Sequence, residues 1–343
     1  MKKPIALILT DTHITPNNIP LVESIFDQAI DVCEQYNIPR IIHDGDWFTS
    51  RSHQALECLL SVSEGIIDKI NSKSIEQLGL QGNHDKTDQS RKEGYMSLFR
   101  DKITLFEDEG FVVIDGICCC FLPFFTDQEY LERLVNLIEK TAKFERKILF
   151  THQSINGVRN NDGSLVEKDI EQEFFVDFDK VIVGHYHNRQ RVGENIYYIG
   201  STHQSKFGED DRKGFTILYS DMSIKYIPTV YPKYIHLKVH VDDDDKIVQA
   251  IEEHKDSDDN VRITLIGDKD KSKAIHKTIF DDTGIDVRFN TMSESTLFDS
   301  PIDEASGEAK VFNKKDLAKH WIKYCTSQSV PAYQRNEGLK FYT

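Results

Sequence analysis

Residues 5–13 read IALILTDTH, an apolar run that ends abruptly in the polar cluster Asp11-Thr12-His13. Short apolar runs of this kind, rich in β-branched residues, indicate buried strands. Four more polar clusters follow strand-like runs: Gly45-Asp46, Gly82-Asn83-His84-Asp85, Thr151-His152-Gln153 and Gly184-His185-Tyr186-His187. Because longer amphipathic segments separate these runs, the pattern predicts an α/β fold that carries its chemistry at strand ends.

The amphipathic segments also divide the chain. Apolar residues recur at helical spacing over 21–36 and 53–71, so helices are expected there. Near residue 230 the pattern changes, and strands over 234–241 and 261–266 flank an acidic helix over 247–254. The expected units are a large domain over 1–230, a small α+β domain over 231–290, a polar linker over 291–310 and a helical tail over 311–343.

The composition describes an acidic protein with enough apolar residues for a large core. The formal net charge is −15 and 39% of the residues are hydrophobic. Nine acidic and two basic residues fall within 242–259, so that segment carries about half of the excess. A chain of this charge is not expected to hold nucleic acid by its own basic surface, because phosphate binding normally requires one.

Neither a membrane span nor a disulfide framework is expected. The longest nearly unbroken apolar run, 117–125, is far shorter than the roughly 18–20 residues of a membrane helix. The apolar run 5–9 is also shorter than the core of a signal peptide, so a cytoplasmic protein is expected. The six cysteines form no CxxC pair, and Cys118–Cys120 reads as a buried strand rather than a soft-metal site.

The polar clusters together hold imidazoles, carboxylates and one carboxamide, the ligand types that suit borderline divalent metals. The candidate ligands are Asp11, His13, Asp46, Asn83, His152, His185 and His187. Seven ligands exceed the four that one tetrahedral ion takes, whereas two ions that share a bridging carboxylate would use all of them. Each residue taken singly would more often be a satisfied structural histidine or a turn residue.

The order DxH, GD, GNH[DE], H and GHxH resembles the calcineurin-like metallophosphoesterase superfamily. The resemblance implies a four-layer α/β/β/α sandwich that hydrolyses phosphoesters with two metal ions. It also implies residue roles: Asp11, His13 and His187 hold one ion, Asn83, His152 and His185 hold the other, Asp46 bridges them, and His84 is the catalytic general acid. His43, Asp44 and Asp85 are either partners of these ligands or ordinary turn residues.

Three further stretches, 198–201, 207–209 and 213–215, resemble the nuclease subunit of SbcC/SbcD-type repair complexes. The closest resemblance is to the recombination endonuclease subunits of T-even-like phages, through residues 7–13. The resemblance implies a homodimeric, manganese- or magnesium-dependent DNA exonuclease and endonuclease that acts in DNA recombination, repair and replication. It implies a small domain that caps the DNA, a tail that docks on an SMC-like coiled-coil ATPase, and, for a phage protein, the host cytoplasm.

Other functions remain open from the sequence. A small-molecule phosphodiesterase or a phosphoprotein phosphatase of the same superfamily is the first alternative, although the GDxxDRG pattern of the phosphatases is absent from residues 45–51. A non-catalytic scaffold for the ATPase is the second. The chain has no GxxxxGK[ST] loop, so ATP-driven steps would need a partner. The apolar stripe over 317–325 either docks on that partner or packs on its own domain.

Candidate DNA contacts are the basic residues Arg51, Arg91, Lys92, Arg189, Arg191, Arg212 and Lys213. Many relatives carry a histidine three residues after the bridging aspartate, where this chain has Thr49. A helix that begins near Ser50 would bring His53 to the same side as Thr49, so His53 is a candidate for positioning the phosphate. A solvated histidine at a helix start is the alternative.

Overall fold

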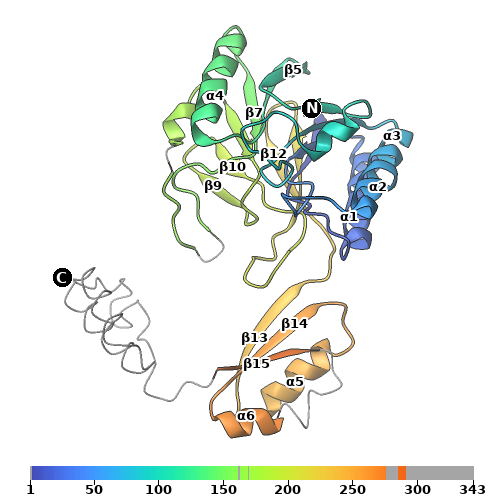
Figure 1. The fold of residues 1–343 in the computed structure, drawn as a ribbon, viewed down its shortest axis with the longest axis vertical. Helices are drawn as coiled ribbons and strands as arrows, with labels where there is room; N and C mark the ends of the chain where they lie inside the picture. Colours follow the sequence, from blue (N-terminus) through green and yellow to red (C-terminus); the bar gives the residue numbers. More distant parts are fainter. Residues whose placement is uncertain (1, 161–162, 169, 276–284, 291–343) are drawn as a thin grey trace, which may run out of the picture.

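The structure, a computed structural model, describes residues 2–160, 163–168, 170–275 and 285–290 (Figure 1). The expected linker and the tail helix, with its apolar stripe over 317–325, lie outside the described residues.

Two six-stranded sheets form the large domain. The first has the order β12 (Ile224–Pro228), β11 (Gly214–Tyr219), β1 (Pro4–Leu9), β2 (Arg40–Asp44), β3 (Glu76–Leu80), β4 (Thr104–Phe106). The second has the order β5 (Gly110–Ile114), β6 (Ile117–Leu122), β7 (Lys147–Thr151), β8 (Lys180–Val183), β10 (Ile196–Tyr198), β9 (Gln190–Val192). Strand β1 confirms the strand expected in the apolar run that begins at residue 5, and β6 confirms the buried strand expected at Cys118–Cys120.

Alternate residues of each strand face different layers, as the two-residue period of a strand requires. Ile8 of β1 packs between the sheets in a cluster that includes Phe121 and Phe150. Leu7 and Leu9 face the opposite way, into a second core under the first group of helices. The helices of that layer are α1 (Ile19–Tyr36), α2 (Leu56–Leu60), the π-helical η1 (Ser61–Asp68) and α3 (Lys69–Ser72). On the outer face of the second sheet lies α4 (Asp127–Thr141), so the predicted four-layer α/β/β/α sandwich is confirmed.

Parallel pairing brings the chemistry to one edge of the sandwich. Strands β1, β2 and β3 are parallel neighbours, as are β6, β7 and β8, so their carboxyl ends share an edge within each sheet. Backbone hydrogen bonds join the loops that follow: the Asp11 N–H donates to Gly45 O at 3.0 Å, and the Gly184 N–H donates to Thr151 O at 3.0 Å. Ligands of open α/β sheets characteristically bind at such an edge.

The helix expected over 53–71 begins later and is not α-helical throughout. Residues 50–53 form a turn in which the His53 N–H donates to the Ser50 hydroxyl oxygen at 3.4 Å. Ala55 is extended, with φ −68° and ψ 143°, and α2 begins only at Leu56. Periodicity cannot reveal this, because a polar turn and a polar first helical turn have similar composition.

The short helices η2 (Tyr95–Phe99) and η3 (Gln172–Phe175) complete the large domain. The third sheet forms a smaller unit, which lies below the large sheets in Figure 1. Its strands are β13 (Tyr234–His240), β14 (Asn260–Ile266) and β15 (Asp286–Asn290), with helices α5 (Asp244–His254) and α6 (Lys269–Ile275).

The strands of this small sheet pair in parallel, and β13, α5 and β14 form a βαβ unit in which the expected acidic helix lies between the two expected strands. Parallel neighbours need a crossover connection, which α5 supplies. Across the described ranges, none of the helices has both the length and the apolar character needed to span a membrane.

Candidate metal centre

The loops at the shared edge hold their polar residues in strained backbone conformations. Asp11, His13, Asp46 and His185 all have positive φ, at 53°, 45°, 56° and 86°. Left-handed conformations of non-glycine residues cost about 1–3 kcal/mol each and persist where the surroundings enforce them, often at functional sites. Four of the candidate ligands therefore have unfavourable backbone conformations, and these conformations set the direction of their side chains.

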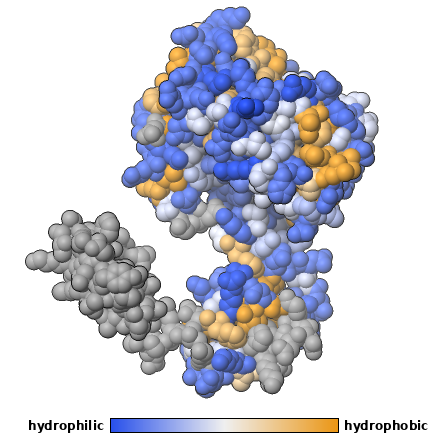
Figure 2. All heavy atoms as spheres, in the orientation of Figure 1, coloured by the Kyte–Doolittle hydropathy of each residue, from blue (hydrophilic) through white to orange (hydrophobic). Residues whose placement is uncertain are grey.

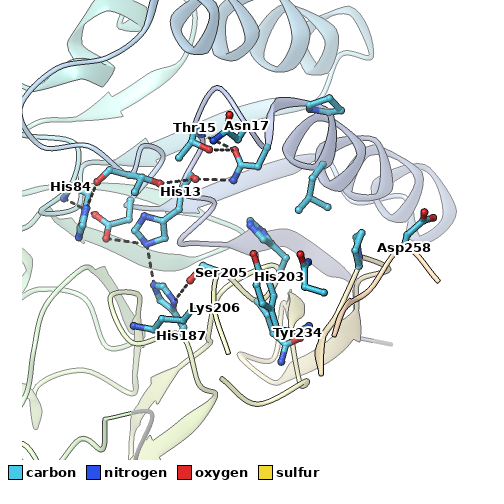
Figure 3. Close-up of a pocket in the computed structure, with 18 of the residues that line it drawn as sticks. His13, Thr15, Asn17, His84, His187, His203, Ser205, Lys206, Tyr234 and Asp258 are labelled. Atoms are coloured by element: carbon cyan, nitrogen blue, oxygen red, sulfur yellow. Dashed lines mark hydrogen bonds and ion pairs between the residues drawn. The ribbon is translucent and has the colours of Figure 1, made fainter. Parts of the chain in front are cut away.

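The first group of candidate ligands joins the two sheets. Asp11 and His13 follow β1, His187 follows β8, and their ligand atoms all lie within 4.8 Å of one another. The Nε2 atoms of His13 and His187 are 3.0 Å apart, and each lies 3.7 Å from Asp11 Oδ1. That oxygen is buried without a hydrogen-bond partner. Figure 3 shows the two imidazoles pointing toward each other.

The second group comprises Asp46, His152 and His185, again within 4.8 Å. His152 Nε2 lies 3.2 Å from Asp46 Oδ2, and His185 Nδ1 lies 2.9 Å from the carboxamide oxygen of Asn83. Asp46 Oδ2 is also 3.6 Å from Nε2 of His13, which belongs to the first group. The Asp46 carboxylate thus lies between the two groups, where a bridging ligand would have to be.

Hydrogen bonds fix which imidazole nitrogens face inward. The Nδ1 atom of His13 faces Phe48 O at 3.2 Å, and that of His152 faces Asp44 O at 2.8 Å. A carbonyl oxygen only accepts, so both Nδ1 atoms carry a proton and both Nε2 atoms face the centre, where each would present a lone pair to a metal ion. Lone pairs that converge on buried carboxylates repel one another unless a cation lies among them. This donor set therefore fits divalent metal ions.

The protein's own charges support the same conclusion. Burial acts to raise the pKa of Asp46, but the facing His152 outweighs it and holds that pKa well below its usual value. Burial lowers the pKa of His185 to about 3. Burial also acts to lower the pKa of His152, yet the charge on Asp46 raises it to about 10. The Asp46 carboxylate is thus ionised, and without a metal ion His152 carries an extra proton. A metal ion bound at Nε2 of His152 would displace that proton.

Two glycines of the motifs are required by close packing around Asp46 and His152. A Cβ on Gly82 would overlap the Asp46 carboxylate, and it would lie 2.5 Å from the Asp46 backbone nitrogen. A Cβ on Gly184 would lie 2.6 Å from both Asp44 O and His152 Nδ1. Only glycine lets these loops approach so closely.

His84 lies beside the two groups and outside both of them. Its backbone N–H donates to Asp46 Oδ1 at 2.8 Å, and its ring centroid is 5.0 Å from that of His13. Its Nδ1 faces Thr49 O at 2.5 Å, and Arg51 donates to its Nε2 at 3.2 Å. Burial lowers the pKa of His84, because it disfavours the charged form of the imidazole. Arg51, which the sequence suggested only as a DNA contact, therefore also contacts the candidate acid.

The prediction that a helix from Ser50 carries His53 to the side of Thr49 is wrong. His53 is exposed, precedes α2 and contacts the hydroxyl of Ser52 through Nδ1 at 2.9 Å. Thr49 itself has a structural part at the centre: its hydroxyl donates to His13 O at 2.8 Å, and its carbonyl accepts from His84.

The candidate DNA contacts differ in how deeply their side chains are buried and in what they contact. Lys213 is fully buried and so presents no surface to DNA. Arg189 is half-buried and donates to Thr216 Oγ1 at 2.9 Å, and burial lowers its pKa to about 10. Arg91, Lys92 and Arg212 form ion pairs with the acidic side chains Asp88, Asp108 and Asp210. Arg191 is exposed and contacts Glu194 O.

The three residues that the sequence left between two interpretations are all buried. Asp85 accepts from the N–H groups of Phe48 at 3.1 Å and Gly82 at 2.9 Å, and so it ties two of the loops together. His43 stacks on Trp47 with ring centroids 3.7 Å apart. Burial raises the pKa of Asp44 well above its usual value.

A cavity of about 830 Å³ opens beside the centre. His13, Asp46 and His84 line one part of it, and Tyr234 and Asn260 of the small sheet line another. Figure 3 shows Tyr234 and Asp258 on the side away from His84. The cavity thus extends from the candidate ligands to the small unit.

No protein-family model matches the chain. It is 25% identical over 238 residues to "Putative phosphoesterase 244L" of Invertebrate iridescent virus 6, which covers 67% of this chain and 82% of that protein. It is 22% identical over 209 residues to "Putative phosphoesterase 078R" of Invertebrate iridescent virus 3, covering 59% of this chain and 58% of the relative.

A third relative is the "DNA double-strand break repair protein Mre11" of Methanocaldococcus jannaschii, 24% identical over 170 residues that cover 47% of this chain and 44% of that protein. The chain thus spans less than two thirds of the second and third relatives. Among solved structures, a calcineurin-like phosphoesterase YfkN from Bacillus subtilis superposes with a TM-score of 0.38 and 13% identity, covering 66% of this chain and 89% of that one.

The sequence relatives, together with the two ligand groups, support a phosphoesterase.

Proposed function

We propose that this chain is a two-metal phosphodiesterase that cleaves DNA, with Mn²⁺ as the preferred ion and Mg²⁺ as the alternative. The observation that carries the metal assignment is the position of Asp46 Oδ2, 3.2 Å from Nε2 of His152 and 3.6 Å from Nε2 of His13. A carboxylate between two sets of inward-facing nitrogens is what a pair of bridged ions needs.

In this proposal the role of each side chain follows from its position in the centre. Asp11, His13 and His187 hold one ion, Asn83, His152 and His185 hold the other, and Asp46 contacts both. Bound ions of this kind make water a better nucleophile and offset charge on the phosphoryl oxygens. For His84 to act as the general acid, Arg51 has to turn away from Nε2, for instance toward a phosphate, and Nε2 has to take up a proton from solvent, which it then donates to the leaving oxygen.

DNA as the substrate rests on the likeness to the archaeal repair protein and on the motif stretches at 198–201, 207–209 and 213–215. The charge of the chain argues that DNA is not held by this chain alone. The net charge is −15, and Asp258 of the acidic segment lines the cavity. We therefore propose a basic partner, an SMC-like coiled-coil ATPase, which would supply the phosphate-binding surface.

One assay tests the proposal and its alternatives. The chain, stripped with EDTA and reloaded with Mn²⁺, is given linear duplex DNA, bis(p-nitrophenyl) phosphate and a phosphopeptide. Hydrolysis of both diesters but not of the phosphopeptide is expected. Activity on the phosphopeptide alone would favour a phosphatase, and no hydrolysis under any metal would favour the scaffold. DNA cleavage unaffected by EDTA would overturn the metal assignment.

Removal of the residues after Gly307 is predicted to abolish co-purification with the ATPase while hydrolysis of bis(p-nitrophenyl) phosphate stays within about two-fold. The reason is that the candidate docking stripe, 317–325, lies in the removed segment, whereas every candidate metal ligand precedes residue 188. Pull-down with the tagged ATPase and a parallel hydrolysis assay measure both effects. Retained association would exclude the tail as the docking element.

We also propose that the chain pairs with a second copy through α2. Leu56 and Leu60, one helical turn apart, are 67% and 46% exposed, and Leu98 of η2 is 68% exposed. Figure 2 shows hydrophobic residues gathered on the side where α2 lies in Figure 1. Leu59, in contrast, packs against the core, so Leu56 and Leu60 are the residues to change.

Replacing Leu56 and Leu60 with glutamate is predicted to convert a dimer into a folded monomer, because the change adds charge to an apolar contact without touching the core. Light scattering after size-exclusion chromatography measures the mass. Val135→Glu, at a side chain 54% exposed on α4, is the matched control and should leave the mass unchanged. A monomeric wild-type chain, or a dimeric double variant, would contradict the prediction.

A further inference from the structure

We infer that Glu209 is a positioning residue for the metal ligand His187, and that the buried Lys213 holds Glu209 in place. The inference rests on the proposed metal centre and adds residues that no ligand motif contains. Glu209 and Lys213 lie in the stretch from the end of β10 to the start of β11, outside the five polar clusters.

The carboxylate of Glu209 is completely buried and fully engaged. Its Oε1 lies 2.8 Å from Nδ1 of His187 and accepts from the Ser205 hydroxyl at 2.8 Å. Its Oε2 accepts from the Ser205 N–H at 3.2 Å and pairs with Lys213 Nζ at 3.1 Å. These four contacts hold the carboxylate in one orientation. Because Oε1 faces Nδ1 of His187, Glu209 in turn fixes the orientation of the His187 ring.

Lys213 connects the same carboxylate to the backbone of the metal ligand. Its side chain is 0% exposed, and its Nζ donates to His187 O at 2.6 Å as well as pairing with Glu209. A fully buried ion pair adds little or nothing to stability when compared with apolar residues of similar size, because both charges lose their hydration. The position of this ion pair fits a different purpose. Lys213 holds the main chain of His187, and Glu209, which Lys213 contacts, holds the His187 ring.

His187 differs from His13 and His152 in the partner of its Nδ1 atom. His13 and His152 direct Nδ1 at backbone carbonyls, which the fold fixes in place. The Nδ1 atom of His187 meets a carboxylate instead, the partner that most strongly favours an Nδ1–H tautomer and makes Nε2 a better metal ligand. Since Nε2 of His187 already lies 3.0 Å from Nε2 of His13, a ring rotation would remove one ligand from the first group.

The test compares Glu209→Gln, which keeps an acceptor but loses the charge, with the double variant Glu209→Leu/Lys213→Met, which removes both buried charges together. Mn²⁺ binding is measured by titration calorimetry. About ten-fold weaker binding of one ion is expected for Glu209→Gln and about 100-fold for the double variant, with the second ion unaffected. Glu109→Gln is the matched control, because Glu109 is 8% exposed and pairs with Arg133 and Lys140 far from the ligands in sequence.

A second readout does not involve metal. In ¹⁵N-histidine-labelled, metal-free protein, two-bond ¹⁵N–¹H spectra report the tautomer of each ring, and His187→Asn assigns the signal. At a pH where the ring is neutral, the wild-type ring should carry its proton on Nδ1, and the double variant should show a mixture of both tautomers. Thermal unfolding of every variant separates loss of folding from loss of positioning.

Wild-type affinity for both ions in a folded double variant, or an unchanged His187 tautomer, would overturn the inference. Failure of the proposed function has a different signature. In that case the wild-type chain itself would bind no pair of ions or hydrolyse no phosphodiester, whatever residue occupies position 209.

Discussion

Asp46→Asn should reduce metal-dependent phosphodiester hydrolysis to the uncatalysed background, a loss of at least about 10³-fold. The substitution keeps the shape of the side chain, and an amide oxygen can still accept from the His84 N–H, which now donates to Asp46 Oδ1 at 2.8 Å. What it removes is the negative charge between His13 and His152. Without that charge nothing offsets the repulsion between two divalent ions held close together.

Mn²⁺ titration and hydrolysis of bis(p-nitrophenyl) phosphate check the Asp46 prediction together. Fewer than two bound ions, with an unchanged circular dichroism spectrum, is the expected result. Asp88→Asn, at an exposed aspartate paired with Arg91, is the control and should behave as wild type. A variant that binds two ions and still turns over at a tenth of the wild-type rate would show that Asp46 does not bridge.

His84→Ala should retain both ions and lose about two to four orders of magnitude in the rate of hydrolysis, the usual contribution of a general acid. His84 reaches neither ligand group; its nitrogens contact Thr49 O and Arg51. The defect should be smaller for bis(p-nitrophenyl) phosphate than for DNA, because p-nitrophenolate leaves readily without a proton.

The comparison of substrates makes the His84 prediction specific. Equal losses on both diesters would indicate that His84 binds the phosphate rather than protonating the leaving group. Loss of an ion from the variant would make His84 a metal ligand. His53→Ala is the matched control, since His53 is exposed and absent from the cavity wall, and it should retain wild-type rates on both substrates.

The layers of the fold could be predicted from the sequence because a polar cluster follows the apolar run of several strands. Asp11 lies two residues after the end of β1, and His152 lies immediately after the end of β7. Each polar cluster therefore indicated where a strand ends. Parallel strands place their carboxyl ends at one edge, and this brought the clusters together without knowledge of the register. The geometry of both ligand groups thus follows from features that each cluster carries by itself.

Other features of the site depend on packing that no local pattern records. Lys213 is a residue type usually exposed to solvent, yet its side chain is fully buried, and the half-buried Arg189 donates to Thr216, 27 residues away. Glu209 could have been suspected from its place in a motif stretch, but its contact with His187 spans 22 residues of loop and strand. The late start of α2 was hidden because the Ser50 turn imitates a helical beginning.

The two ligand groups also have a consequence for the order in which the molecule can be made. His13 is synthesised 174 residues before His187, and β1 receives its neighbour β11 only once the chain has passed residue 214. Contacts between such distant residues form late, because a long loop must close first. A nascent chain therefore carries Asp11, His13, Asp46 and Asn83 before the three histidines of the second sheet have been made. Each ligand group becomes complete only when both sheets have formed.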